Sequence, residues 1–383
     1  MSNSLGKVSS AHQISIGEKI NNDKINEIFY SFIDVFDEYL KLNNDLYANE
    51  ILENLKKNKK LCFPLNKHME LFIYKHLDNP EKLIRYIIFR FKFYIAGTRK
   101  INLGYPPYIL IETVSTCNLR CPFCFQTDKT FTKKPFMGII NFDLFTDVLD
   151  QADKLGVGAI TIGSRGEPTM HKKFNEMLDY TSEKNNILEV KLNTNGSYLT
   201  EKICHSIFRN NLTQVVISSD HYIKKNYEKL RVGSNFEKIV SNVDMLFSIR
   251  KEHYPNSITE IRISGVDNER NLDRKKFKEF WIKRCDHVSA TYPLERWNTY
   301  KNSPHPEIKD PCENLWDRMY VWFDGKVNPC DADYKSFLSY GDANKFDLKD
   351  LWNNKVIEKN RKLHLAEKRG QINPCDRCGA SYI

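Results

Sequence analysis

Short runs of β-branched and other apolar residues alternate with longer amphipathic stretches over residues 107–292. In the longer stretches, such as FDLFTDVLDQADKLG, apolar residues recur every three or four positions, which is typical of helices packed on a core. The six short runs are YILIETV (108–114), VGAITIG (157–163), LEVKLNT (188–194), QVVISS (214–219), TEIRISG (259–265) and HVSATY (287–292). Six strands that alternate with helices predict an α/β fold with a parallel sheet.

The pattern changes on both sides of this region. Residues 15 to about 100 keep the helical period with little strand character, as in INEIFYSFIDVFDEYL. After residue 300 the alternation stops, prolines mark a linker, and four clustered cysteines follow. We therefore expect a helical N-terminal region over 1–104, an α/β core over 105–300 and a small, metal-stapled C-terminal domain over 301–383.

Polar segments follow four of the predicted strands. Three cysteines come directly after the first strand, GSRGEPTMH (163–171) after the second, NTNGSY (193–198) after the third and SDH (219–221) after the fourth. The carboxyl ends of parallel strands meet at one edge of the sheet, where α/β folds place their chemistry. The sequence thus predicts an active site at this edge.

Charge and hydropathy narrow the choice of partner only slightly. The net charge is +9, from 58 Lys and Arg against 49 Asp and Glu, and no long basic block occurs. We therefore expect no stable nucleic-acid partner. The mild positive charge is as compatible with an anionic small-molecule substrate as with a nucleic acid. No apolar run reaches the roughly 18 residues that a membrane span needs, and no secretory signal is visible, so we expect a cytoplasmic protein without a membrane span.

Seven of the ten cysteines fall in two groups, and such clusters in a reducing compartment indicate metal binding or catalysis rather than disulfides. The first group, Cys117, Cys121 and Cys124, has no fourth cysteine beside it. A structural zinc site needs four ligands, and an ordinary iron–sulfur cube takes four cysteines. Three ligands leave one metal position open, where a small molecule can coordinate. Zinc remains the alternative.

The spacing Cys-x3-Cys-x2-Cys, with Phe123 before the last cysteine, resembles that of the radical S-adenosylmethionine (SAM) superfamily. RGEP (165–168) is similar to the family's Gly-Gly-Glu-Pro element, with Arg165 in place of the first glycine. NTNG (193–196) and SSD (218–220) fall where the family places ribose and substrate contacts.

The resemblance implies a partial (β/α)6 TIM-type barrel and a [4Fe–4S] cluster on Cys117, Cys121 and Cys124. It also implies reductive cleavage of bound SAM to a 5′-deoxyadenosyl radical, which abstracts a hydrogen atom from the substrate. An electron donor such as flavodoxin or ferredoxin would be needed. The expected SAM-binding residues are Gly166, Glu167, Asn195, Ser218, Ser219 and Arg262.

The C-terminal region resembles the SPASM/Twitch extension of radical SAM enzymes, through its cysteines and the stretch GDANKFDLKDLWNNK (341–355). Its four cysteines are Cys312, Cys330, Cys375 and Cys378. The resemblance implies one auxiliary [4Fe–4S] cluster, and four cysteine ligands would leave it no open site for substrate. Electron transfer or a structural role is therefore expected, with a zinc knuckle as the alternative.

An auxiliary cluster that accepts an electron suits a net oxidation. The expected function is oxidation of an alcohol on a sugar-like or nucleotide-sugar substrate in carbohydrate biosynthesis. The pattern is similar to radical SAM proteins of bacterial surface-carbohydrate gene clusters. The alternatives are a peptide- or protein-modifying maturase, a radical epimerase and a non-enzymatic zinc-knuckle module. A base is needed for alcohol oxidation, and His221 and Asp220 are the candidates.

Overall fold

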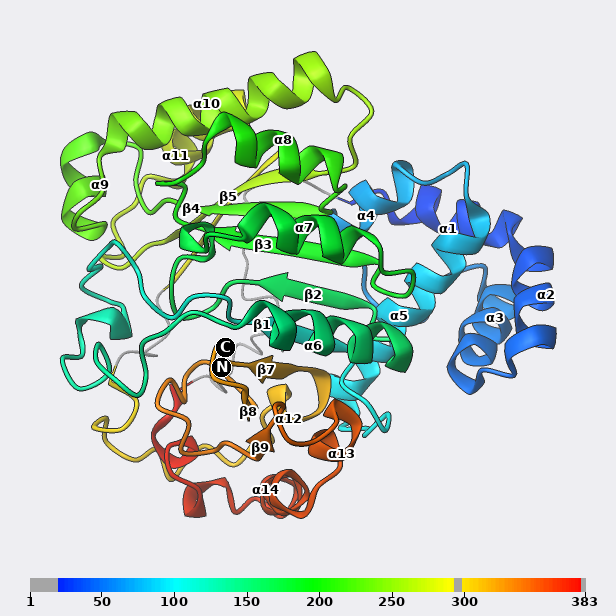
Figure 1. The fold of residues 1–383 in the computed structure, drawn as a ribbon. Coiled ribbons are helices and arrows are strands. Elements are labelled where there is room, and N and C mark those ends of the chain that lie inside the picture. The colour runs from blue at the N-terminus through cyan, green and yellow to red at the C-terminus, as the bar shows by residue number, and fades with distance from the viewer. Residues whose placement is uncertain (1–19, 293–297, 380–383) are drawn as a thin grey trace, which may run out of the picture.

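The computed structural model describes residues 20–292 and 298–379. Its centre is one sheet of nine strands in the order β6-β5-β4-β3-β2-β1-β7-β8-β9 (Figure 1). The first six strands are parallel neighbours: β1 Tyr108–Ile111, β2 Ala159–Ile162, β3 Glu189–Thr194, β4 Gln214–Ser218, β5 Glu260–Val266 and β6 His287–Thr291. All six predicted strands are confirmed. Since β6 and β9 are the sheet's edges, the barrel is open, as expected for a partial (β/α)6 barrel.

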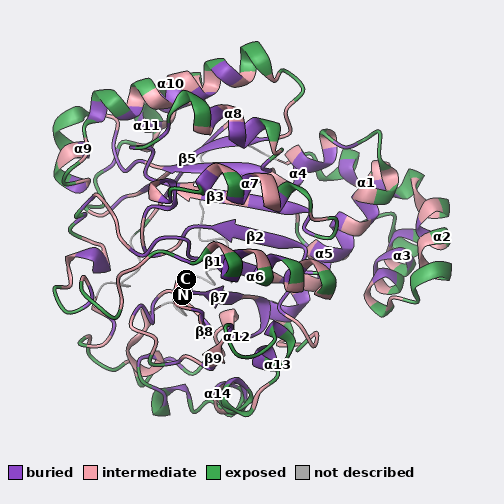
Figure 2. Ribbon diagram, in the orientation of Figure 1, coloured by how far each residue is buried: buried purple, intermediate pink, exposed green. Residues whose placement is uncertain are grey.

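Six helices cover the outer face of these strands: α6 Phe142–Leu155, α7 Phe174–Ser182, α8 Glu201–Arg209, α9 Lys224–Leu230, α10 Phe236–His253 and α11 Arg274–Trp281. Alternate strand residues point to opposite faces, so Ile160, Leu192 and Ile261 join the helices in one apolar core. Figure 2 shows the strands buried beneath helices whose outer surfaces are exposed. The opposite, barrel-lining face carries polar residues such as Lys191 and Arg262.

The C-terminal region extends the same sheet. Its first strand, β7 Met319–Val321, pairs in parallel with β1, and β8 Lys326–Asn328 and β9 Gly341–Asp342 continue antiparallel. The helices α12 Asn314–Asp317, α13 Leu348–Trp352 and α14 Lys355–Leu365 flank these strands. Trp316 and Trp352 belong to the same apolar core as the barrel. Without β7, β1 would be an exposed edge strand of the sheet. Because β7 pairs with β1, the C-terminal region and the barrel share one continuous sheet.

The N-terminal region is helical, as predicted, with α1 Asn22–Ser31, α2 Ile33–Asn43, α3 Leu46–Asn58, α4 Lys67–Tyr74 and α5 Pro80–Thr98. These helices have their own apolar core and lie at the amino ends of the barrel strands (Figure 1). The α5 helix buries its apolar residues, and Phe89 packs so closely on Gly158 that a Cβ there would lie 2.1 Å from the ring. Within residues 20–292 and 298–379, the structure has no helix with the length and apolarity needed to cross a membrane.

One polar network joins the N-terminal helices to the barrel. His68 of α4 lies between two strand carboxylates, with its Nε2 3.3 Å from Glu189 and its Nδ1 2.8 Å from Glu260. Tyr86 and Arg90 of α5 also bind Glu189. Burial alone would lower the pKa of His68, but the two carboxylates outweigh burial and raise it to about 9. The imidazolium therefore holds the helical region to the barrel.

Replacing His68 with Gln is expected to destabilise the protein in a pH-dependent way. A raised pKa contributes stability that is fully present below pH 6.5 and is lost as the pH rises through about 9. The shift corresponds to about 3 kcal/mol. Thermal unfolding of wild type and His68→Gln between pH 6 and 9.5 should show a gap that closes toward the alkaline end. A gap independent of pH would show that the imidazolium charge contributes nothing.

Candidate active site

The three cysteines of the first group lie on the loop that follows β1. Cys117 Sγ accepts a hydrogen bond from the Leu119 N–H at 3.5 Å, and Cys124 Sγ accepts one from the Gln126 N–H at 3.5 Å. Burial, with a smaller contribution from neighbouring thiols, raises the pKa of Cys117 to about 11 and that of Cys124 to about 12. Cysteines bind metal as thiolates, so this buried loop needs a cationic centre to stabilise them.

The loop can hold a cluster. The three thiols lie within one short loop, and each interacts electrostatically with at least one other member of the group. Within the described part of the chain, no three His, Cys, Asp or Glu side chains converge closely enough to bind a single metal ion. The cysteines of an iron–sulfur cube bind different irons, so a cube does not require them to meet at one point.

Arg231 is a member of this site that sequence reasoning missed. Its Nη1 lies 4.0 Å from Cys121 Sγ, and its guanidinium stands over the Phe123 ring, 5.6 Å from the centroid. The carboxylate of Asp220 holds it there, with Nη2 donating to Oδ1 at 3.0 Å. Burial opposes the charge of Arg231, but Asp220 outweighs it and raises the pKa of the guanidinium. Nothing in the local sequence of Arg231 marks this role.

The loop after β2 packs directly against the cysteine loop. A Cβ on Gly166 would lie 2.3 Å from the carbonyl oxygens of Val114 and Thr116, so only glycine fits. The N–H of Glu167 donates to the Thr116 carbonyl at 2.9 Å. In the described part of the chain the Gly166 carbonyl accepts no hydrogen bond, so it is available to an amine such as that of SAM. The Glu167 N–H is already bonded to the Thr116 carbonyl, so it is not available to a ligand.

The Glu167 side chain organises the active-site edge. Its carboxylate accepts hydrogen bonds from the Thr169 and Thr194 hydroxyls and, at 2.7 Å, from the Asn195 N–H. Burial raises the pKa of Glu167, and these hydrogen bonds oppose the rise. Asn195 in turn directs its Nδ2 at Asn118 Oδ1, 2.9 Å away, and at Cys117 Sγ, 3.7 Å away. The loops after β1, β2 and β3 therefore meet, as the sequence predicted for this edge.

The predicted SAM contacts Ser218 and Ser219 lie at the end of β4, where Ser219 is buried and donates to the His221 carbonyl at 3.4 Å. Arg262 lies on the barrel-lining face of β5, where its guanidinium contacts Ser289. The structure therefore places Arg262 in a cavity at the amino ends of the strands. Its predicted contact with the methionyl carboxylate stays a prediction.

Asp220 and His221 have partners within the fold. Asp220 accepts from Arg231 and from the Val266 N–H. His221 Nδ1 accepts from the N–H groups of Tyr222 and Ile223 at 3.0 and 2.9 Å, and its Nε2 lies 3.1 Å from Asn226 Nδ2. Burial lowers the pKa of His221. This geometry gives Asp220 a positioning role toward Arg231, and a base role for either residue remains a prediction.

The second cysteine group gathers in the C-terminal region. Cys312 precedes α12, Cys330 follows β8, Cys375 begins a single 3₁₀ turn, and Cys378 directly follows that turn. Burial raises the pKa of Cys330 well above its usual value, and the other three thiols raise it further. The other three thiols of the group are therefore close enough to Cys330 to interact with it electrostatically. Arg369 supports the turn by donating to the carbonyls of Cys375 and Cys378 at 3.0 and 2.8 Å.

Aromatic and charged side chains lock the two cysteine regions together. Phe125, next to Cys124, stacks on Tyr334 with ring centroids 5.0 Å apart. The Tyr334 hydroxyl donates to Asp128 at 3.0 Å, and Lys335 pairs with the same carboxylate at 2.7 Å. Three residues after Cys330, the Asp333 carboxylate is itself buried and held by the Tyr300 hydroxyl at 2.7 Å. The first cysteine loop is thereby shielded from one side by the C-terminal region.

Arg165 replaces the first glycine expected at this loop and reaches the same junction. Its Nε donates to Glu112 Oε1 at 2.7 Å, and both side chains are almost inaccessible to solvent. Its Nη1 donates to the Tyr334 carbonyl at 2.6 Å, and its guanidinium stacks on Trp322, 4.1 Å from the ring centroid. The substitution therefore links β1, the loop after β2 and the C-terminal region.

Two families match the chain. Residues 111–280 match the radical SAM superfamily, and residues 312–379 match SPASM, an iron–sulfur cluster-binding domain. A GTP 3′,8-cyclase of Clostridium botulinum (strain Langeland) is 26% identical over 303 residues, which cover 68% of this chain and 92% of that protein. The match to the cyclase of the Okra strain spans only 50% of that protein. A tungsten-containing aldehyde ferredoxin oxidoreductase cofactor-modifying protein of Pyrococcus furiosus is 32% identical over 114 residues, 30% of each chain.

Solved structures share the fold at low sequence identity. SuiB of Streptococcus suis bound to S-adenosylmethionine has a TM-score of 0.54 at 16% identity, covering 92% of this chain and 87% of that one. BtrN in complex with AdoMet and 2-DOIA has a TM-score of 0.51 at 18% identity, covering 72% and 93%. The sulfur sites described above fit what these families imply: SAM, a [4Fe–4S] cluster and an auxiliary iron–sulfur cluster.

Proposed function

Because this chain is a radical SAM protein with a C-terminal SPASM domain, we propose that it oxidises an alcohol of a sugar-like or nucleotide-sugar substrate. The observation that carries the proposal is the second cysteine group. Cys312, Cys375 and Cys378 all interact electrostatically with Cys330, and a cluster held by these four thiols has no position left for substrate. Such a cluster suits the acceptance of an electron.

When bound, a cluster on Cys117, Cys121 and Cys124 together with SAM would supply a 5′-deoxyadenosyl radical, and the auxiliary cluster would supply an acceptor for one electron. Removal of a hydrogen atom from the carbinol carbon, followed by loss of one proton and one electron, converts the alcohol to a carbonyl. The external electron donor would be a protein such as flavodoxin or ferredoxin.

The chain's own residues would bind SAM, orient the active-site loops and shield the cysteine loop from water. Gly166 offers its carbonyl oxygen to the SAM amine, and Glu167 fixes the backbone of Asn195 beside Cys117. The Phe125–Tyr334 stack keeps water from the cysteine loop. The hydroxyl proton needs a base, for which His221 and Asp220 remain the predicted groups. Holding the reacting carbon close is the protein's largest contribution.

A peptide-modifying function is the alternative, and the N-terminal region does not favour it. Peptide maturases of this family often carry a small winged-helix domain there, which needs strand pairs. The described residues 20–107 form helices and loops without a strand. The curated relatives named for GTP chemistry also support a phosphorylated small molecule over a peptide.

The reconstituted enzyme is expected to transfer deuterium from a carbinol carbon into 5′-deoxyadenosine. Sugar phosphates and nucleotide sugars deuterated at single carbinol positions would be incubated anaerobically with SAM and reductant. Mass spectrometry would then follow 5′-deoxyadenosine and an oxime-trapped carbonyl product. A product that regains a solvent hydrogen with inverted stereochemistry would assign an epimerase instead, and labelling from peptides alone would assign a maturase.

A further inference from the structure

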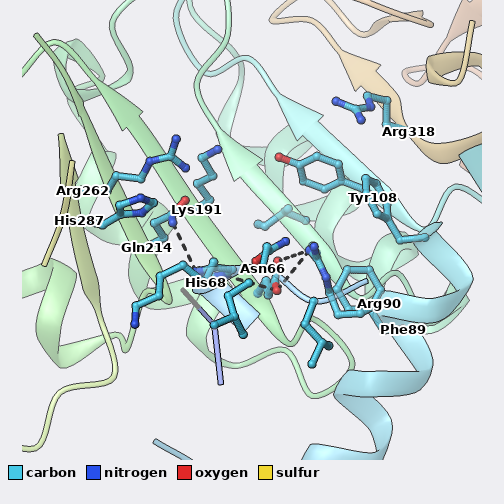
Figure 3. Close-up of a pocket in the computed structure, with 17 residues that line it drawn as sticks. Asn66, His68, Phe89, Arg90, Tyr108, Lys191, Gln214, Arg262, His287 and Arg318 are labelled. Atoms are coloured by element: carbon cyan, nitrogen blue, oxygen red, sulfur yellow. Dashed lines mark hydrogen bonds and ion pairs between the residues drawn. The ribbon is translucent and has the colours of Figure 1, made fainter. Parts of the chain in front are cut away.

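A cavity of about 400 Å³ lies at the amino ends of the barrel strands, beside helices α4 and α5 (Figure 3). This is the end of the barrel opposite the cysteine loop. Its walls carry several cations: His68 and Arg90 from the helices, Lys191 and Arg262 from the barrel-lining face, and Arg318 from the segment before β7. The volume is within the range of small-ligand sites.

Most of these cations already have carboxylate partners. Arg90 pairs with Glu189, and His68 lies between Glu189 and Glu260. Arg318 pairs with Asp317, with Nε donating to Oδ1 at 2.7 Å. Their charges are therefore largely compensated inside the protein.

Lys191 and Arg262 are the exceptions. Arg262 is 4% exposed, and its guanidinium bonds only the hydroxyl oxygen of Ser289, at 2.8 and 3.2 Å, among the described residues. Lys191 has neither a hydrogen bond nor an ion pair within that part of the chain. Figure 3 shows their charged ends on the same side of the cavity, above His68 and directed away from it.

The two cations also repel each other. Burial, reinforced by the charge of Arg262, outweighs the carboxylates of Glu189 and Glu260 and lowers the pKa of Lys191 to about 8. Burial lowers the pKa of Arg262 to about 10. Arg262 is buried and Lys191 is half-buried, and a cation withdrawn from water without an anionic partner is costly. A dianionic ligand would compensate both.

We propose that Lys191 and Arg262 bind a phosphate or diphosphate group of the substrate at the amino ends of the barrel strands. Lys191 lies on β3, and Asn195, the residue that directly follows the end of β3, contacts Cys117. At about 3.3 Å per extended residue, the four residues from Lys191 to Asn195 span at most about 13 Å. A phosphorylated sugar held at this depth would direct its sugar ring toward the radical site.

The anion site is independent of the proposed alcohol oxidation, whereas the identity of its ligand as substrate rests on that function. The site also competes with the predicted role of Arg262 in binding the methionyl carboxylate of SAM. If Arg262 and Lys191 bind the same anion, substitution of either residue should weaken binding of that anion. A role in SAM binding predicts an effect of Arg262 alone.

The test is calorimetric titration of the reconstituted protein with inorganic pyrophosphate and, separately, with SAM. We would compare wild type with Lys191→Met, Arg262→Met and Lys275→Met, a control whose side chain is 87% exposed on α11. We expect pyrophosphate binding to weaken about tenfold or more in each cavity variant and to be unchanged in the control. Without ligand, Lys191→Met should unfold at a higher temperature than wild type, because an uncompensated charge is gone.

Three results would overturn the proposal. Pyrophosphate that fails to bind wild type, or binds all variants equally, removes the anion site. Weaker SAM binding in Arg262→Met with unchanged pyrophosphate binding in Lys191→Met assigns Arg262 to SAM. If deuterium-transfer assays identify a substrate, an unchanged KM in Lys191→Met removes the link between this cavity and substrate, whatever reaction that substrate undergoes.

Discussion

Replacing Cys117, Cys121 and Cys124 together with alanine is expected to abolish SAM cleavage and halve the iron content, from about eight to about four atoms per chain. The three thiols lie on one partly buried loop and include every cysteine of that loop, so the variant removes all of its sulfur ligands. Iron and sulfide would be measured after anaerobic reconstitution, and 5′-deoxyadenosine formation by chromatography.

Two further variants make the iron count decisive. Cys62→Ala removes a half-buried thiol of the N-terminal region, outside both groups, and should keep about eight irons and full SAM cleavage. Alanine at Cys312, Cys330, Cys375 and Cys378 should also leave about four irons, those of the first loop. About four irons in wild type would contradict an auxiliary cluster, and bound zinc without iron would contradict the radical chemistry altogether.

Replacing Arg165 with Met is expected to destabilise the folded protein by about 3–5 kcal/mol, the range for breaking a buried ion pair. Glu112 has no exposure to solvent and would keep a buried, uncompensated carboxylate. The variant also loses the hydrogen bond to the Tyr334 carbonyl and the contact with Trp322. Thermal unfolding of the reconstituted protein would report the loss as a fall of several degrees in Tm.

A matched surface pair calibrates this effect. Arg209 and Asp179 form the same kind of bond at 2.8 Å, but their side chains are 59% and 48% exposed. Arg209→Met should therefore cost no more than about 1 kcal/mol. The double variant Arg165→Met/Glu112→Met should recover part of the stability, because it buries no unpaired charge. An effect of Arg165→Met as small as that of Arg209→Met would show that the buried pair is unimportant.

Local sequence was enough to predict the strands, the helical N-terminal region and the sulfur chemistry. Alternating and three-to-four-residue periods report which side of an element is buried, and the burial of Ile160 and Leu192 follows them. The cysteine spacing reports chemistry in the same local way, because Cys117, Cys121 and Cys124 need only one loop to come together. These features depend on residues close in the chain.

Which side chains and strands pair with one another depends on residues far apart in the chain, and only the tertiary structure decided these pairings. Arg165 looked like a simple departure from a glycine motif, yet it pairs with a carboxylate 53 residues away. The three-residue strand β7 carries too little pattern to be predicted, and it forms because β1 offers an unpaired edge. Lys191 and Arg262 come from different strands, and the barrel's curvature brings their charges into one cavity. The sequence by itself determined which elements form and which chemistry the cysteines support, because both are local. Only packing decided which charges pair with carboxylates and that Lys191 and Arg262 share one cavity.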